Sequence, residues 1–173
     1  KNVYFITSAG EIYSMSYETF TINWLYKITI RELEKKIDLF FSSPIVYDNN
    51  SILLSTSAST VLVNSVTGAL KWQLPFSTPI RPIISNDNIF MISKDGFILN
   101  INKSDGKVIW SRELFKISPR KFNKKKIGEI NSLILISDQI FITTTNGYFL
   151  FLNYQNLEII NYAKVDRKGF FSK

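Results

Sequence analysis

The chain has 173 residues, of which 45% are apolar and 14% aromatic, and its formal net charge is +7. This apolar content is enough to bury a core and argues against disorder. Cysteine and histidine are both absent, which excludes disulfides, thiol nucleophiles, thiolate or imidazole metal sites and the most common general base. Phe, Ile, Val, Thr and Tyr crowd short segments, a composition typical of an all-β protein.

One pattern occurs four times along the chain: an apolar strand, a small turn and a second apolar strand. The turns fall in register, because Gly10, Gly96 and Gly147 each precede a closing Ser or Asn by six residues, and Ala58 takes that place in the second copy. Gly is favoured in hairpin turns, since it adopts positive φ without steric cost. The four copies are residues 2–16, 51–64, 88–102 and 139–153.

A second turn and a third strand follow in every copy. In the two central copies a Gly stands four residues after an Asn, and a Trp stands four residues after that Gly. The outer copies keep the spacing but lose the Gly, and the last copy also loses the Trp. In chain order the four sets are Ser16, Phe20 and Trp24; Asn64, Gly68 and Trp72; Asn102, Gly106 and Trp110; and Asn153, Leu157 and Asn161.

Three further strands are predicted before the later hairpins, at residues 44–48, 79–85 and 130–137. Four strands per copy, with 38 to 51 residues between turn positions, indicate propeller blades rather than shorter solenoid repeats. We therefore predict an all-β chain containing about four antiparallel four-stranded β-propeller blades. The blades are expected at residues 2–28, 44–76, 79–114 and 130–165, with long links at 29–43 and 115–129.

At the second turn the chain resembles the PQQ-like repeat of quinoproteins. The matching segments are Thr67-Gly68 with Trp72, and Ser104-Asp105-Gly106-Lys107 with Trp110. The resemblance implies that each Trp packs against the next blade. Trp24, Trp72, Trp110, Gly68 and Gly106 are thus predicted to pack blades together, and their fixed register favours this role over a stacking platform for a cofactor. The family's Asp is replaced by Asn64, Asn102, Asn153 and Ser16, so its usual interactions are expected to be weakened or replaced.

The resemblance extends to quinoprotein dehydrogenases and, most closely, to BamB-type outer-membrane protein assembly factors. Such propellers commonly form rings of seven or eight blades. Four blades would leave two open ends, so either the chain is a fragment of a longer one or two copies self-associate to close the ring. The start on an inner hairpin strand favours the fragment.

A quinoprotein dehydrogenase would need a carboxylate base and Ca²⁺ ligands on the inner strands. Those strands offer only Arg81, Asn131 and the terminal Asp48. We therefore expect no catalytic residue, no cofactor and no metal, although catalysis in a missing half stays an alternative. The polar segments 48–50, 86–88 and 137–139 are typical of hairpin turns, and calcium loops are the less favoured interpretation.

The link 115–129 concentrates positive charge. It carries Lys116, Arg120, Lys121, Lys124, Lys125 and Lys126 against the single acid Glu129. The opposite face gathers Glu18, Asp48, Asp87, Asp105, Asp138 and Glu158 against Lys103, so we expect opposite charges on the two faces. The basic patch is either a solvated loop or an attractor for an acidic protein or anionic surface. Nucleic acid is not expected, because few aromatic residues accompany the lysines.

The link 29–43 has cancelling charges and ends with Phe40 and Phe41. Leu33, Ile37 and these Phe residues stand at helical spacing, which predicts a short amphipathic helix or an apolar contact segment. Capping of the core and contact with a partner are equally compatible with this pattern, since exposed Phe pairs are unusual.

Our functional hypothesis is a non-catalytic scaffold, not an enzyme, that presents the links 29–43 and 115–129 to a protein partner. The resemblance implies an outer-membrane assembly barrel protein as that partner and a periplasmic or outer-membrane-associated location. No apolar run approaches the length of a membrane helix, so membrane association would need a lipid anchor outside these residues. The alternatives are the non-catalytic half of a PQQ-dependent dehydrogenase, and anion or nucleic-acid binding through the basic loop 116–126.

Overall fold

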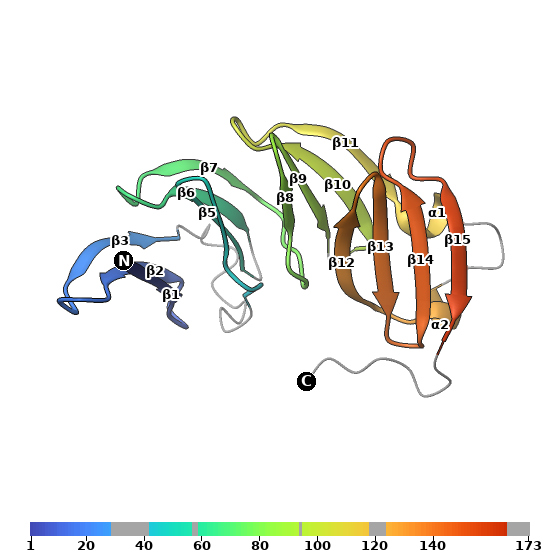
Figure 1. The fold of residues 1–173 in the computed structure, drawn as a ribbon, viewed down its shortest axis with the longest axis horizontal. Coiled ribbons are helices and arrows are strands. Elements are labelled where there is room, and N and C mark those ends of the chain that lie inside the picture. Colours follow the sequence, from blue (N-terminus) through green and yellow to red (C-terminus); the bar gives the residue numbers. More distant parts are fainter. Residues whose placement is uncertain (29–41, 57–58, 94, 118–123, 166–173) are drawn as a thin grey trace.

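The computed structural model describes residues 1–28, 42–56, 59–93, 95–117 and 124–165. Its strands form four antiparallel sheets that follow one another along the chain and stand side by side in an open arc (Figure 1). Within each sheet every strand is hydrogen-bonded to the next strand in sequence. The predicted all-β class and the architecture of antiparallel blades are confirmed.

The first sheet contains three strands and each of the others contains four. The first sheet is β1 (Asn2–Ile6), β2 (Glu11–Ser16) and β3 (Ile22–Lys27). The second is β4 (Val46–Asp48), β5 (Ser51–Ser55), β6 (Thr60–Asn64) and β7 (Leu70–Leu74). The third is β8 (Ile83–Ser85), β9 (Asn88–Ile92), β10 (Phe97–Asn102) and β11 (Val108–Glu113). The fourth is β12 (Ile130–Ile136), β13 (Gln139–Thr144), β14 (Tyr148–Asn153) and β15 (Ile159–Lys164).

Two very short helices belong to the link 115–129. Helix α1 (Leu114–Ile117) follows β11 directly, and α2 (Lys124–Ile127) precedes β12. Residues 118–123 between them lie outside the described residues, as do residues 29–41 of the other link. The amphipathic helix predicted in the link 29–43 therefore remains a prediction.

The inner strand of the third sheet is shorter than the predicted segment 79–85. It begins only at Ile83, because Pro79 and Pro82 have no N–H to donate to a neighbouring strand. The predicted hairpin glycines have positive φ, at 76° for Gly10, 85° for Gly96 and 77° for Gly147. Ala58 lies outside the described residues.

Among the residues that the structure describes, the hydrophobic core forms three clusters, each between neighbouring sheets. Ile12 and Leu54 meet between the first and second sheets, and Leu53 meets Ile89 between the second and third. The largest cluster lies between the third and fourth sheets and contains Phe90. The second and third sheets are therefore buried on both faces, which gives the rigid support expected of stacked blades.

Candidate functional site

The first junction between blades is built around one tryptophan. Trp24 of β3 reaches the second sheet, where its Nε1 donates a hydrogen bond of 2.9 Å to the carbonyl of Ser65. Its ring covers Gly68 so closely that a Cβ there would lie 2.7 Å from ring carbons. Because Gly68 also has a φ of +72°, only glycine fits this turn without strain.

The second junction repeats this geometry. Nε1 of Trp72 donates a hydrogen bond of 2.9 Å to the carbonyl of Lys103, and a Cβ on Gly106 would lie 2.8 Å from the Trp72 ring. Each Trp thus contacts the turn of the following blade rather than its own. Two equivalent contacts of this kind fix the relative positions of the first three blades.

The third junction is built differently. Leu157 stands where the other turns have Gly, with a φ of +59° and a side chain that is only 1% exposed. Trp110 packs at a tilt against Phe90, with 6.2 Å between ring centroids, and Phe90 meets Tyr154 edge-on. Aliphatic and aromatic packing therefore replaces the contact between Trp and Gly.

The side chains that replace the family's Asp still cap these turns. Oδ1 of Asn64 accepts hydrogen bonds from the amides of Val66 and Thr67, at 2.8 and 3.0 Å. Equivalent bonds run to Asn102 from the Ser104 amide, to Asn153 from the Gln155 amide and to Oγ of Ser16 from the Thr19 amide. The interaction is replaced by a neutral equivalent in every copy, because an amide or hydroxyl oxygen also accepts from a backbone N–H.

The described part of the basic link is firmly anchored. Leu114 and Ile127 are fully buried in the cluster between the third and fourth sheets. Nδ2 of Asn146 donates a hydrogen bond of 3.0 Å to the carbonyl of Lys126, and the Glu129 amide donates one of 2.9 Å to Oγ1 of Thr145. The hairpin between β13 and β14 therefore holds α2 in place.

The predicted partner-binding residues fall into three groups. Lys125 and Lys126 are exposed on the anchored helix α2. Lys116 is also exposed, but its Nζ lies 2.6 Å from Oε2 of Glu113 in an ion pair. The remaining members lie outside the residues whose side chains the structure describes: Phe40, Phe41, Arg120, Lys121 and Lys124.

A cavity of about 190 Å³ lies between the third and fourth blades, next to helix α1. Its lining includes Ile80, Ile92, Phe115 and Glu129. Phe115 also closes over Gly96, where a Cβ would lie 3.1 Å from its ring. Sequence reasoning missed this cavity, since its residues come from four separate stretches of the chain with no motif in common.

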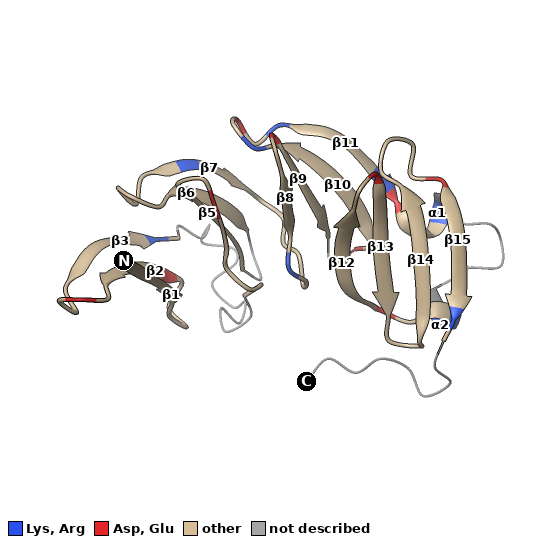
Figure 2. Ribbon diagram, in the orientation of Figure 1, with Lys and Arg blue, Asp and Glu red and all other residues tan. Residues whose placement is uncertain are grey.

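The opposite face is less acidic than predicted. Lys103 forms an ion pair with Asp48, and Nζ of Lys107 lies 3.1 Å from Oδ2 of Asp105. Figure 2 shows blue and red segments together in the turn between β10 and β11. The prediction counted Lys103 alone and left out Lys107, which stands in the same turn.

Hydrogen bonds lower the pKa of Asp105 on this face. The backbone amide of Lys107 donates to Oδ1 of Asp105 at 3.0 Å, and this bond, followed by the bond from the Lys107 side chain, lowers the pKa of Asp105. Both bonds stabilise the charged carboxylate. The carboxylate thus helps to hold the turn on which Trp72 rests.

The polar turns proposed as hairpins have the backbone that such turns need. Asn49, Asn50, Asn86 and Ser137 all have positive φ, as expected for tight two-residue hairpin turns. Within the described ranges, no three acidic side chains lie close enough together to hold a metal ion. In the same ranges, no helix has the length and apolar character needed to span a membrane.

Comparison with known sequences gives a family match and a curated relative. The family model described as outer membrane protein assembly factor BamB matches residues 1–112. An uncharacterized protein of Rickettsia conorii is 30% identical over 103 residues, which make up 55% of this chain and 24% of that protein. The chain therefore spans about a quarter of the length of this curated relative.

Several solved structures share the fold. BamB from Moraxella catarrhalis superposes with a TM-score of 0.74 at 16% identity, over 95% of this chain and 47% of that one. A europium-containing methanol dehydrogenase gives 0.67 at 10% identity, over 94% and 40% of the two chains. The computationally designed Ika8 protein gives 0.66 at 9% identity, over 99% and 50%. At such identities the likeness shows the fold alone.

Proposed function

The chain belongs to the family described as outer membrane protein assembly factor BamB, and we propose that it is a non-catalytic scaffold that binds a protein partner through its link face. The link face is the side of the blades that carries α1, α2 and the hairpin between β13 and β14 (Figure 1). The partner we propose is an outer-membrane assembly barrel protein. A periplasmic or outer-membrane-associated location follows from the same proposal.

The observation that carries this proposal is the fixed display of exposed lysines. Lys125 and Lys126 project from α2, whose backbone is bonded to Asn146 and whose Ile127 is fully buried. A preorganised surface loses little conformational entropy on docking. Exposed cations on such a surface accelerate association with an acidic partner.

The experiment compares two variants that change the net charge equally. Lys125→Glu alters the link face, whereas Lys107→Glu alters an exposed lysine on the opposite face. Binding of each to the purified outer-membrane assembly barrel protein is measured at several salt concentrations. We expect Lys125→Glu to weaken binding by about tenfold or less, mainly through the association rate, and Lys107→Glu to have little effect.

Equal effects of the two variants would refute the link face as the binding surface. Two assays test other functions of the same protein. Oxidation of an alcohol or sugar after addition of PQQ and Ca²⁺ would contradict the non-catalytic proposal. Binding to RNA or anionic vesicles that Lys125→Glu abolishes, without binding to the barrel protein, would favour an anion-binding function instead.

A further inference from the structure

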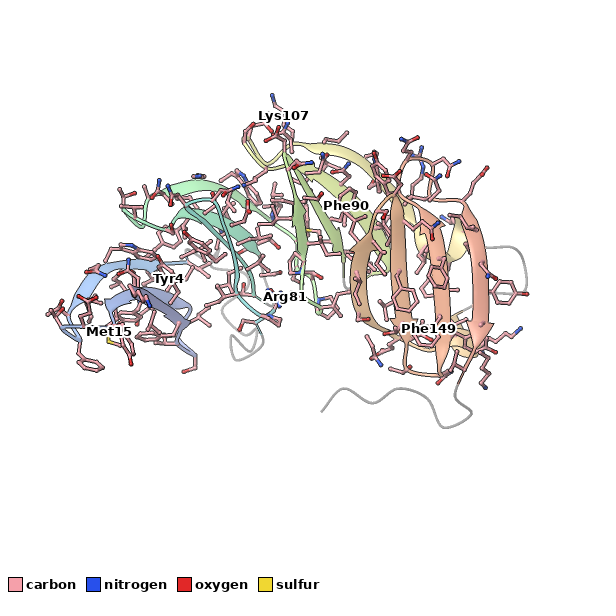
Figure 3. All side chains as sticks on the ribbon, viewed as in Figure 1. Tyr4, Met15, Arg81, Phe90, Lys107 and Phe149 are labelled. Atoms are coloured by element: carbon pink, nitrogen blue, oxygen red, sulfur yellow. The ribbon has the colours of Figure 1, made fainter. Side chains whose placement is uncertain are left out.

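The cavity between the third and fourth blades has an apolar interior. Ile80 and Ile92 of its lining are buried members of the largest hydrophobic cluster, and Phe115 and Ile130 are partly buried against the same cluster. Figure 3 shows Phe90, another member of this cluster, on the side of the third sheet that faces the fourth. The cavity is therefore an extension of the hydrophobic core that reaches the end of the blades where α1 lies.

Hydrogen bonds hold the walls of this cavity in place. On the third blade, the Gly96 amide donates to the carbonyl of Ser93 at 2.9 Å, and the Leu114 amide donates to the carbonyl of Gly96 at 3.1 Å. On the fourth blade, the Glu129 amide donates to Oγ1 of Thr145 at 2.9 Å, and the Thr145 amide donates to the carbonyl of Glu129 at 2.8 Å. Walls that are already ordered reduce the entropic cost of binding.

Glu129 contributes one carboxylate to the lining of the cavity. The residue is exposed, and among the side chains that the structure describes, no Lys or Arg forms an ion pair with it. Glu113 on the neighbouring strand β11, by contrast, is paired with Lys116. A carboxylate without a cation, next to an apolar cavity, favours a ligand that carries a positive charge and disfavours one that carries a negative charge.

The volume of the cavity is suited to a single six-membered ring. An engineered cavity of about 150 Å³ lined by Leu, Ile and Phe in another protein binds benzene, and this cavity has a volume of about 190 Å³. Pockets for larger organic ligands usually start at about 300 Å³. The ring of Phe115 favours an aromatic guest, because two aromatic rings attract each other beyond the area that they bury.

We propose that this cavity binds a phenylalanine side chain of a protein partner in which a Lys or Arg stands next to that phenylalanine. The ring packs among Ile80, Ile92 and Phe115, and the neighbouring cation pairs with Glu129. One aromatic side chain in a fixed pocket is the usual anchor of a protein interface. The inference goes beyond the scaffold proposal and does not rest on it, since free peptides test it in the absence of the barrel protein.

The test is an NMR titration of the full chain with the peptide acetyl-Gly-Phe-Arg-Gly-amide. We expect saturable shifts of the amide resonances of Ile92, Gly96 and Glu129, with a Kd of about 1 mM. A peptide with Ala in place of Phe is expected to give no saturable shifts. A peptide with Gln in place of Arg is expected to bind about two- to fivefold more weakly, because it keeps the ring and loses an exposed ion pair.

Two matched variants of the protein locate the charge. Glu129→Gln is expected to remove the preference for the Arg peptide over the Gln peptide and to leave the affinity for the Gln peptide unchanged. Glu158→Gln makes the same change of charge at an exposed residue in the turn between β14 and β15, so the preference should persist. Equal effects of these two variants would overturn the pairing with Glu129.

A third variant tests the cavity itself. Ile130→Trp places a larger side chain at a half-buried position of the lining and is expected to abolish binding of both peptides, with far-ultraviolet circular dichroism as the check on folding. Absence of saturable shifts in the native chain, or equal affinities for the Phe and Ala peptides, would overturn the proposal. Shifts of the same resonances that grow with protein concentration without peptide would assign the cavity to a second copy and overturn it as well.

Discussion

Replacing Gly106 by Ala tests how the second and third blades are held together. The substitution places a Cβ 2.8 Å from the Trp72 ring at a residue whose φ is +73°. Two costs therefore add, one from the backbone and one from the collision. The ring cannot move away freely, because its Nε1 is bonded to the carbonyl of Lys103 and its side chain is buried.

The size of the effect follows from these two costs. A non-glycine residue in the left-handed region costs about 1–2 kcal/mol, and overpacking of a well-packed contact costs about 1–3 kcal/mol. We expect Gly106→Ala to lower the free energy of unfolding by about 2–5 kcal/mol. This is a large fraction of the total stability of a typical domain.

A double-mutant cycle separates the two costs. Urea denaturation followed by far-ultraviolet circular dichroism is measured for Gly106→Ala in the native chain and in a Trp72→Val background, where the collision is removed. In that background only the backbone cost of about 1–2 kcal/mol should remain. The reasoning is refuted if Gly106→Ala costs less than about 1 kcal/mol in the native chain, or the same in both backgrounds.

Three further predictions concern other turns. Phe20→Gly should raise stability by about 0.5–1 kcal/mol in urea denaturation, because it relieves a φ of +56° at a side chain that is 71% exposed. Leu157→Gly, at the equivalent but buried position, should lower stability by about 2–5 kcal/mol. Effects of equal sign would contradict this contrast. The pKa of Asp105 is below its ordinary value of 3.8, so the carboxylate stabilises the folded turn above that pH and the contribution is lost as the pH falls through the lowered pKa. An NMR titration should show that Lys107→Ala moves the pKa of Asp105 upward, and no movement would exclude the ion pair as a cause. Lys103→Met should lower stability by about 1–3 kcal/mol in urea denaturation, because it leaves the half-buried carboxylate of Asp48 without its cation. An unchanged denaturation midpoint would contradict a stabilising ion pair.

The repeat and its register were predictable from local signals. The Gly at each hairpin and the spacing from Asn64 through Gly68 to Trp72 recur along the chain, and each reflects a requirement of a single turn or strand pair. The truncation of β8 was predictable in principle, since Pro82 cannot donate a hydrogen bond. It was missed because an apolar run was given more weight than its two prolines.

The candidate site was less accessible to sequence reasoning. A run of lysines marked the basic link, but only the fold shows that Asn146 and Thr145 anchor α2 from a hairpin some 20 residues away. The charge balance of the opposite face was misjudged because Lys107 was left out of the count, although it stands only two residues from its partner Asp105.

The sequence by itself determined that this chain forms antiparallel blades, because strand alternation, turn glycines and Trp spacing act over a few residues at a time. The tertiary structure decided how the blades meet: Trp24 and Trp72 dock on glycine, while Trp110 packs against Phe90 in the cluster that contains the buried Leu157. Contacts between blades join residues about 30 to 40 positions apart, and such contacts depend on the shape of two folded surfaces rather than on any local pattern.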